Sequence, residues 1–347
     1  MTTRRFAILL LALLAALAVL YMVAAVLVDP RGIFGLGLAR PVTWNTREAK
    51  VELFEKFNRE RPVEGLILGS SRTMKIAPGE CEARLGKRFF NFCVARAMTE
   101  DYLSIYRWAR ARDPRVAVLL IGLDVDALLG DERAGDTLEG TDDLLKTLEG
   151  RGRPGWGERV WDVLGRLDQI LSRDYALDMV RSLWVSARGT KADIAWETDG
   201  ALQYLDLDRQ RALGSLDFKS GLADSLKRFQ NTFKGVPAVS TRRRGYLEEL
   251  LDEAGRDGVE VVLWITPLHP FVARRLAQGT RYEALLDETR SYVKELGVRY
   301  GVRTYDFSEP SSFGGTDSGW YDGEHMDAAN AALIVQKVAE GAQPSGR

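Results

Sequence analysis

The chain contains few of the residues that build metal sites and disulfide frameworks. Its 347 residues include only two cysteines and two histidines. Two cysteines are too few for a zinc site or a disulfide scaffold, so Cys81 and Cys93 form either one disulfide or two separate thiols. A glycine-rich phosphate loop and a cluster of histidines and carboxylates are both missing from the sequence. We therefore expect neither a bound metal nor a cofactor.

An excess of positive charge is also missing. Lysine and arginine number 48 against 49 aspartate and glutamate residues, a formal net charge of −1. A protein that tracks nucleic-acid phosphates needs a clustered positive excess, so no nucleic-acid partner is expected. The hydrophobic fraction of 46% argues against disorder and indicates a folded soluble region.

The sequence has one long apolar run. Residues 6–28 carry no charge, and at 1.5 Å rise a 23-residue helix reaches roughly 34 Å, enough to cross a bilayer core of about 30 Å. A signal peptide is the alternative, although its apolar region usually has about 7–15 residues and ends at a cleavage site. Arg4 and Arg5 predict a cytoplasmic N-terminus. We expect a single-pass protein of the inner membrane whose outer part lies in the periplasm or its equivalent.

The remainder has the pattern of an α/β fold, in which short apolar runs alternate with helical periods. Strands are expected at 65–68, 89–94, 116–122, 259–265 and 302–307, and crossover helices at 99–112, 241–256, 282–297 and 327–340. This order predicts a three-layer α/β/α domain with a five-stranded, mainly parallel, flavodoxin-like sheet. The expected domains are a membrane anchor at 1–30, a juxtamembrane linker and helix at 31–62, and the α/β domain at 63–345.

A long insertion separates the third and fourth expected strands. Residues 129–240 are too many for a loop, and helical periods at 161–183 and 215–229 indicate a mainly helical region. The insertion is either a packing cap over the sheet edge or a lid or acceptor-docking surface beside the site.

Two short motifs carry the candidate chemistry. Gly69-Ser70-Ser71-Arg72 follows an apolar strand, and Asp322-Gly323-Glu324-His325 lies near the C-terminus. A serine hydroxyl becomes a good nucleophile when an imidazole takes its proton and a carboxylate orients that imidazole. Taken separately, the motifs are also consistent with a helix N-cap and a surface histidine. Together they favour a serine–histidine site.

These motifs resemble those of the SGNH hydrolase superfamily. The chain is similar to its membrane-anchored, extracytoplasmic branch, which has Gly-Ser-Ser-Arg in place of Gly-Asp-Ser-Leu and includes proteins of D-alanyl-lipoteichoic acid biosynthesis and, more distantly, of alginate O-acetylation. The resemblance covers the outer domain apart from the insertion. It implies Ser71 as nucleophile, with a backbone N–H at a helix start that binds an oxyanion, His325 as base and Asp322 as its orienting group.

The chain departs from the family pattern at two positions. In the block beginning at Asn91, Arg96 stands where a glycine normally donates its N–H, and it either donates instead or holds an anionic substrate. Asp124 stands where hydrolases place an oxyanion-binding asparagine. An ionised carboxylate would repel an oxyanion, so Asp124 is expected to be protonated, turned away, or paired with Arg72 or Arg96. Ser70 takes the family's Asp position.

The expected function is acyl transfer through an acyl-serine intermediate. Water as acceptor makes an esterase, and a sugar hydroxyl makes an O-acyltransferase. The resemblance implies an acylated glycan or envelope polymer as substrate and a membrane-bound acyltransferase, acyl carrier or transporter as partner. His269 follows an expected strand and either lines the pocket or is structural. The alternative function is a catalytically inactive glycan-binding or scaffold subunit.

Overall fold

The computed structural model describes residues 3–30, 38–39, 46–131, 138, 142–148, 170–188 and 194–341. These form two compact units, one comprising Met1–Ala49 with Arg153–Lys191 and the other comprising Lys50–Gly152 with Ala192–Arg347. The linker expected before residue 46 falls outside the described residues, apart from 38–39. The expected domain boundaries remain a prediction.

The smaller unit contains two helices in its described part. Helix α1 (Thr3–Val28) has a window of mean hydropathy 2.9 with none of it buried, and it is long and apolar enough to cross a membrane. The prediction of one such N-terminal helix is confirmed, whereas its orientation and its membrane remain predictions. Helix α8 (Arg173–Ala187) packs against α1. Part of the helix expected at 161–183 is present in α8, and residues 161–169 lie outside the described part of the chain.

The larger unit is built on a five-stranded parallel sheet with the order β2-β1-β3-β6-β7. The strands are β1 (Gly65–Leu68), β2 (Phe89–Asn91), β3 (Val118–Leu123), β6 (Glu260–Ile265) and β7 (Arg303–Asp306). Each expected strand is present, and the predicted α/β fold is confirmed. The helices of this unit are α2 (Thr46–Glu60), α3 (Pro78–Leu85), α4 (Thr99–Arg112), α6 (Asp142–Leu148), α9 (Leu205–Ala212), α10 (Phe218–Phe233), α11 (Thr241–Arg256), α12 (Pro270–Gly279), α13 (Tyr282–Tyr300) and α14 (Ala328–Glu340), with 3-10 turns at Val125–Leu128 and Pro310–Phe313.

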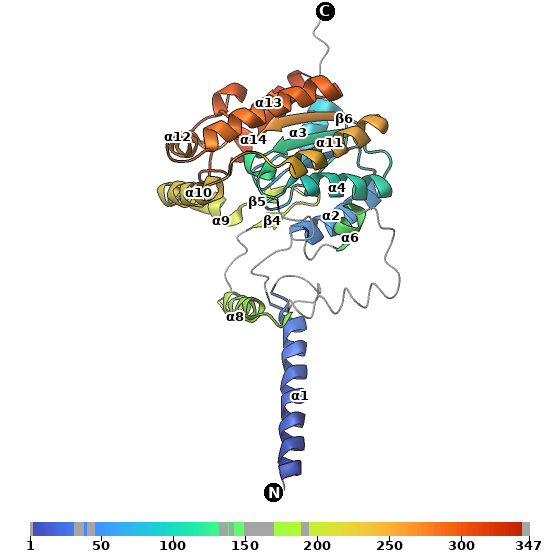
Figure 1. Cartoon of the computed structure of the whole chain (residues 1–347), viewed down its shortest axis with the longest axis vertical. Coiled ribbons are helices and arrows are strands. Elements are labelled where there is room, and N and C mark those ends of the chain that lie inside the picture. Colours follow the sequence, from blue (N-terminus) through green and yellow to red (C-terminus); the bar gives the residue numbers. More distant parts are fainter. Residues whose placement is uncertain are drawn as a thin grey trace, which may run out of the picture. The chain divides into compact units, whose positions relative to one another are not determined.

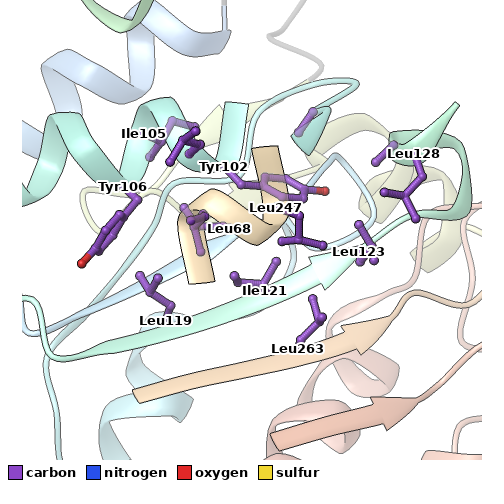
Figure 2. Close-up of a cluster of buried hydrophobic side chains, with 14 of the residues drawn as sticks. Leu68, Tyr102, Ile105, Tyr106, Leu119, Ile121, Leu123, Leu128, Leu247 and Leu263 are labelled. Atoms are coloured by element: carbon purple, nitrogen blue, oxygen red, sulfur yellow. The ribbon is translucent and has the colours of Figure 1, made fainter. Parts of the chain in front are cut away.

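The strands bury alternate residues on opposite faces because side chains alternate across a sheet. Leu119, Ile121 and Leu123 of β3 face one core, which is closed by α2, α4, α11 and α13. Figure 2 shows these three leucine and isoleucine side chains beside Tyr102 and Ile105 of α4. The alternate residues of the strands face a second core closed by α3 and α14. Two helical layers therefore enclose the sheet, as expected for a fully buried parallel sheet.

The insertion is mainly helical in its described part, as predicted. It contributes α6, α9 and α10 to the larger unit, and α10 lies beside α12 (Figure 1). The sequence did not predict the short antiparallel pair β4 (Ala195–Trp196) and β5 (Leu202–Gln203). Strands of two residues are too short to show an alternating pattern.

The two cysteines are free thiols. Both are buried, Cys81 on α3 and Cys93 just after β2. The Cys93 Sγ lies 3.0 Å from the Thr73 hydroxyl. Burial raises the pKa of Cys93 to about 12 and that of Cys81 well above its ordinary value. Of the two alternatives left by the sequence, the structure has the buried thiols.

Candidate active site

The turn that carries Ser71 is shaped by two glycines. Gly69 follows β1 with φ +153°, and a Cβ there would lie 2.2 Å from the Thr73 hydroxyl oxygen. A Cβ on Gly122 of β3 would lie 2.3 Å from the Thr73 methyl carbon. A larger residue at either position would therefore displace Thr73 and the turn to which it belongs.

The helix expected to begin at this serine is absent from the described structure, and that expectation was wrong. Residues 71–75 form turns, and the next helix, α3, begins at Pro78. A proline disfavours helical geometry in the residue before it, and it is well suited to the first helical position. Ala77 accordingly has ψ 119°, and the helix starts one residue later.

The buried side chain of Asn91 holds this turn in place. Its amide nitrogen donates to the carbonyl oxygens of Thr73, Met74 and Ile76 at 2.9–3.3 Å, and its oxygen accepts from the Cys93 N–H at 3.1 Å. The end of β2 thereby fixes the backbone that follows Ser71. The only sequence signal for this role was a polar residue in an apolar strand.

The structure brings together the three residues expected to form the catalytic relay. The His325 Nε2 lies 2.9 Å from the Ser71 Oγ, and the His325 Nδ1 lies 2.7 Å from the Asp322 Oδ2. The other Asp322 oxygen accepts from the backbone N–H groups of Glu324 and His325, each at 2.8 Å. The carboxylate is thus pinned on one side and faces the imidazole on the other.

His269 contacts the loop that carries Asp322 and His325. Its backbone N–H donates to the Gly323 carbonyl at 3.0 Å. Its Nδ1 accepts from the Phe271 N–H at 3.1 Å, and its Nε2 lies 3.2 Å from the Asp317 carbonyl oxygen. Burial lowers the pKa of His269 below its ordinary value. Both ring nitrogens of His269 are thus engaged by backbone groups, and its role in the site remains a prediction.

The insertion contributes side chains to the site. On α10, the Ser225 hydroxyl accepts from the Gly323 N–H at 3.2 Å, and Arg228 forms an ion pair with Glu324. Tyr204, just before α9, stacks edge-on against His325 with ring centroids 5.8 Å apart. Periodicity did not reveal these residues, since serine, arginine and tyrosine in an amphipathic region give no sign of their neighbours.

Arg72 and Asp124 form a buried charged pair behind Ser71. The Arg72 guanidinium lies 3.4 Å from the Asp124 Oδ1 and 2.7 Å from Asp126, and the Thr266 hydroxyl donates to Asp124. Burial raises the pKa of Asp124, while Arg72 and a hydrogen bond from Ser70 oppose that rise. Burial disfavours the charged form of Arg72, but Asp124 and Asp126 outweigh it and raise the pKa of Arg72. Of the alternatives expected for Asp124, the structure shows pairing with Arg72.

Arg96 adopts the conformation that suits a glycine. Its φ is +51°, a left-handed conformation that side chains disfavour, and the residue is exposed. The pKa of Arg228 is lowered mainly by burial. The positive charges of Arg72 and Arg96 also lower it, because they repel that of Arg228. In the described part of the chain, no group accepts a hydrogen bond from the backbone N–H of Ser71 or of Arg96. Among the described residues, these two N–H groups are therefore the candidates for binding a developing negative charge.

The sequence predicted no cluster of histidines and carboxylates, and this prediction was wrong: in the described structure the ligand atoms of Asp322, Glu324 and His325 lie within 4.8 Å of one another, so these residues could hold a metal ion. Each already has another partner: Asp322 binds two backbone N–H groups, Glu324 pairs with Arg228, and His325 contacts Ser71. Three ligand groups engaged in this way are better suited to moving a proton than to coordinating a cation.

Comparisons with known proteins place the chain in no family. No protein-family model matches it, and no curated protein matches it. Among solved structures it is similar to one described as a "putative acylhydrolase" from Bacteroides fragilis, with 10% sequence identity, 85% of this chain and 97% of that chain covered, and a TM-score of 0.38. So distant a likeness carries no argument, and the function of this site rests on its own geometry.

Proposed function

We propose that the protein is a serine esterase or O-acyltransferase of the SGNH type that works through an acyl-serine intermediate. The observation that carries the proposal is the continuous relay from Ser71 Oγ through His325 to Asp322, with contacts of 2.9 and 2.7 Å. In this arrangement the imidazole can accept the serine proton while the carboxylate holds it in the required tautomer.

The first half-reaction forms the acyl-enzyme. Ser71 Oγ attacks the acyl carbonyl carbon and gives its proton to His325 Nε2, while Asp322 stabilises the resulting imidazolium. The N–H groups of Ser71 and Arg96 support the negative charge that develops on the carbonyl oxygen. The tetrahedral intermediate collapses, the bond to the leaving alcohol breaks, and His325 returns the proton to the leaving oxygen.

In the second half-reaction, His325 takes a proton from the acceptor, whose oxygen attacks the acyl carbon and releases Ser71. Water as acceptor gives hydrolysis, and a sugar hydroxyl gives O-acyl transfer. The relay serves both acceptors, so the name of the reaction depends on which one reaches the acyl-enzyme first.

The setting of the site favours an envelope substrate. The N-terminal helix supports membrane anchoring, and the arginines in its first residues favour placing the larger unit outside the cytoplasm. Arg96 and Arg228 are positive groups that influence each other near this relay, which supports an anionic acylated glycan or envelope polymer. A membrane-bound acyltransferase is the proposed partner, since it would supply acyl groups at the same membrane.

The test is labelling of the full chain in detergent with a fluorophosphonate, which reacts with activated serines. Wild type should be labelled, and Ser71→Ala and His325→Ala should not. The matched control is Ser311→Ala, which removes an exposed serine outside the site and should retain full labelling. Full labelling of Ser71→Ala would refute the assignment.

The alternative is an inactive glycan-binding or scaffold subunit. It is favoured by Asp124, a carboxylate at the position where the resemblance places an oxyanion-binding asparagine. Folded wild type that remains unlabelled, and that binds acylated polysaccharide with unchanged affinity after Ser71→Ala, would support this function over catalysis.

A further inference from the structure

Helix α8 has two apolar faces, and one of them packs on the last two turns of α1. The buried residues of this contact include Tyr175 and Met179 of α8 with Ala25 and Val28 of α1. The Tyr175 hydroxyl donates to the Ala25 carbonyl at 3.2 Å, and the Tyr21 hydroxyl donates to the carbonyl of Ile170. The two helices are therefore joined at the C-terminal end of α1.

The opposite face of α8 is apolar and exposed. Its large side chains are 46–65% exposed and recur at three-to-four-residue spacing, which places them on one side of the helix: Leu177, Val180, Leu183 and Trp184. A soluble helix normally turns charged residues outward, so a stripe of this kind indicates a further contact.

The place where α8 meets α1 indicates what covers this stripe. If the hydrocarbon core begins near Phe6, the 20 residues to Ala25 span about 30 Å, so α8 meets α1 where the helix leaves the core. The exposed side chains of α1 are apolar over this span, as a lipid-facing surface requires. If α1 spans the membrane, the exposed face of α8 lies at the depth of the headgroups.

The chemistry of α8 suits that depth. Trp184 is an aromatic residue of the kind that concentrates at membrane interfaces, and the Arg188 guanidinium lies 3.7 Å from the centre of its ring. Arg181 is 72% exposed beside the stripe, where its long side chain can reach water or lipid phosphates.

We propose that α8 lies at the interface between lipid and water, on the side of the membrane where the C-terminal end of α1 emerges. There it buries its apolar face among the lipids and gives the protein a second membrane contact beside α1. The proposal rests on α1 spanning the membrane and not on acyl transfer. An in-plane amphipathic helix of this type binds through its buried apolar area.

The experiment places an environment-sensitive fluorophore on single introduced cysteines of the full chain in lipid nanodiscs. Val180→Cys probes the apolar face, Arg181→Cys is the matched control one position along α8, and Leu11→Cys reports insertion of α1. The native Cys81 and Cys93 are buried and should not react. Lipids spin-labelled near the headgroup should quench the label at 180 at least threefold more than the label at 181, with a blue-shifted emission at 180.

Equal, weak quenching at 180 and 181 would overturn the proposal. So would a label at 180 that is shielded in native membranes but water-exposed in nanodiscs of lipid alone, because that result assigns the face to a protein partner. A label at Leu11 whose emission is not blue-shifted would show that α1 is not inserted and would overturn the proposal as well. Fluorophosphonate labelling of the same samples tests the proposed catalysis separately, so the two failures are distinguishable.

Discussion

Replacement of Asp322 by asparagine is the sharpest test of the proposed relay. In the structure, one carboxylate oxygen accepts from the N–H groups of Glu324 and His325, and the other faces the His325 Nδ1. An asparagine would keep its amide oxygen on the two N–H donors and turn its NH₂ group toward Nδ1. The imidazole would then carry its proton on Nε2 and could not accept one from Ser71.

The expected magnitude follows from the charge that is lost. With imidazolium and carboxylate centres about 4 Å apart in this partly exposed site, an effective dielectric constant near 20 gives an attraction of about 4 kcal/mol. At about 1.4 kcal/mol per factor of ten, Asp322→Asn should slow the reaction of Ser71 by roughly 10³-fold, and the wrong tautomer should slow it further.

The assay is the second-order rate constant of fluorophosphonate labelling at neutral pH. The matched control is Asp327→Asn, which changes a nearby carboxylate that caps α14 by accepting from the Asn330 N–H at 3.0 Å. Asparagine is an equally good cap, so this variant should label at the wild-type rate. A folded Asp322→Asn protein that labels within tenfold of wild type would refute the relay.

Three further predictions concern charged residues. Burial lowers the pKa of Lys50 to about 7 in the folded state, so above that pH the unfolded state binds one proton more than the folded state. The free energy of unfolding should therefore rise by up to about 1.4 kcal/mol per pH unit from about pH 7 toward pH 10. Urea unfolding at several pH values measures this slope. Arg72→Met should lower the free energy of unfolding by about 3–5 kcal/mol by leaving Asp124 buried and unpaired, with partial recovery toward pH 5 as Asp124 takes up a proton. Arg96→Gly should raise the free energy of unfolding by about 1 kcal/mol at most, because glycine accepts the left-handed φ. The same change should reduce kcat/KM for an anionic ester more than for a neutral one.

Each of these predictions has a contrary result. Lys50→Met should remove the pH slope, and an unchanged slope would show that another group causes it. Arg72→Met with unchanged stability would mean that Asp124 is not held by this pair; Arg61→Met, which removes an exposed arginine from its pair with the exposed Glu82, provides a surface control. Equal loss of kcat/KM on both esters in Arg96→Gly would contradict a role in recognising charge.

Much of the fold was predictable because it depends on local patterns. β1, β3 and β6 are short apolar runs, and burial on both faces of a parallel sheet makes such runs recognisable, whereas the edge strand β7 is more polar and only partly buried. Helix α4 has the bounds expected from its apolar spacing. The turn after Ser71 was not predicted, because an N-cap serine suggests a helix, whereas Pro78 delays the helix until the chain has passed Ala77.

The site was predictable only in part. The order of the two motifs suggested that Ser71 and His325 act together, but sequence separation says nothing about the contacts that surround them. Asn91 holds the nucleophile turn, Ser225 binds the loop before His325, and Arg228 pairs with Glu324. These contacts join distant segments, and no periodicity within one segment encodes them.

The sequence by itself determined the apolar N-terminal helix, the strand positions and the residues able to form a relay, because each of these depends on composition or spacing along the chain. Only the tertiary structure decided the ionic surroundings of the site. A buried Asp124 is stabilised by Arg72 beside it and would be destabilising without it, since the energy of a buried charge depends on the groups that folding places within a few ångströms of it.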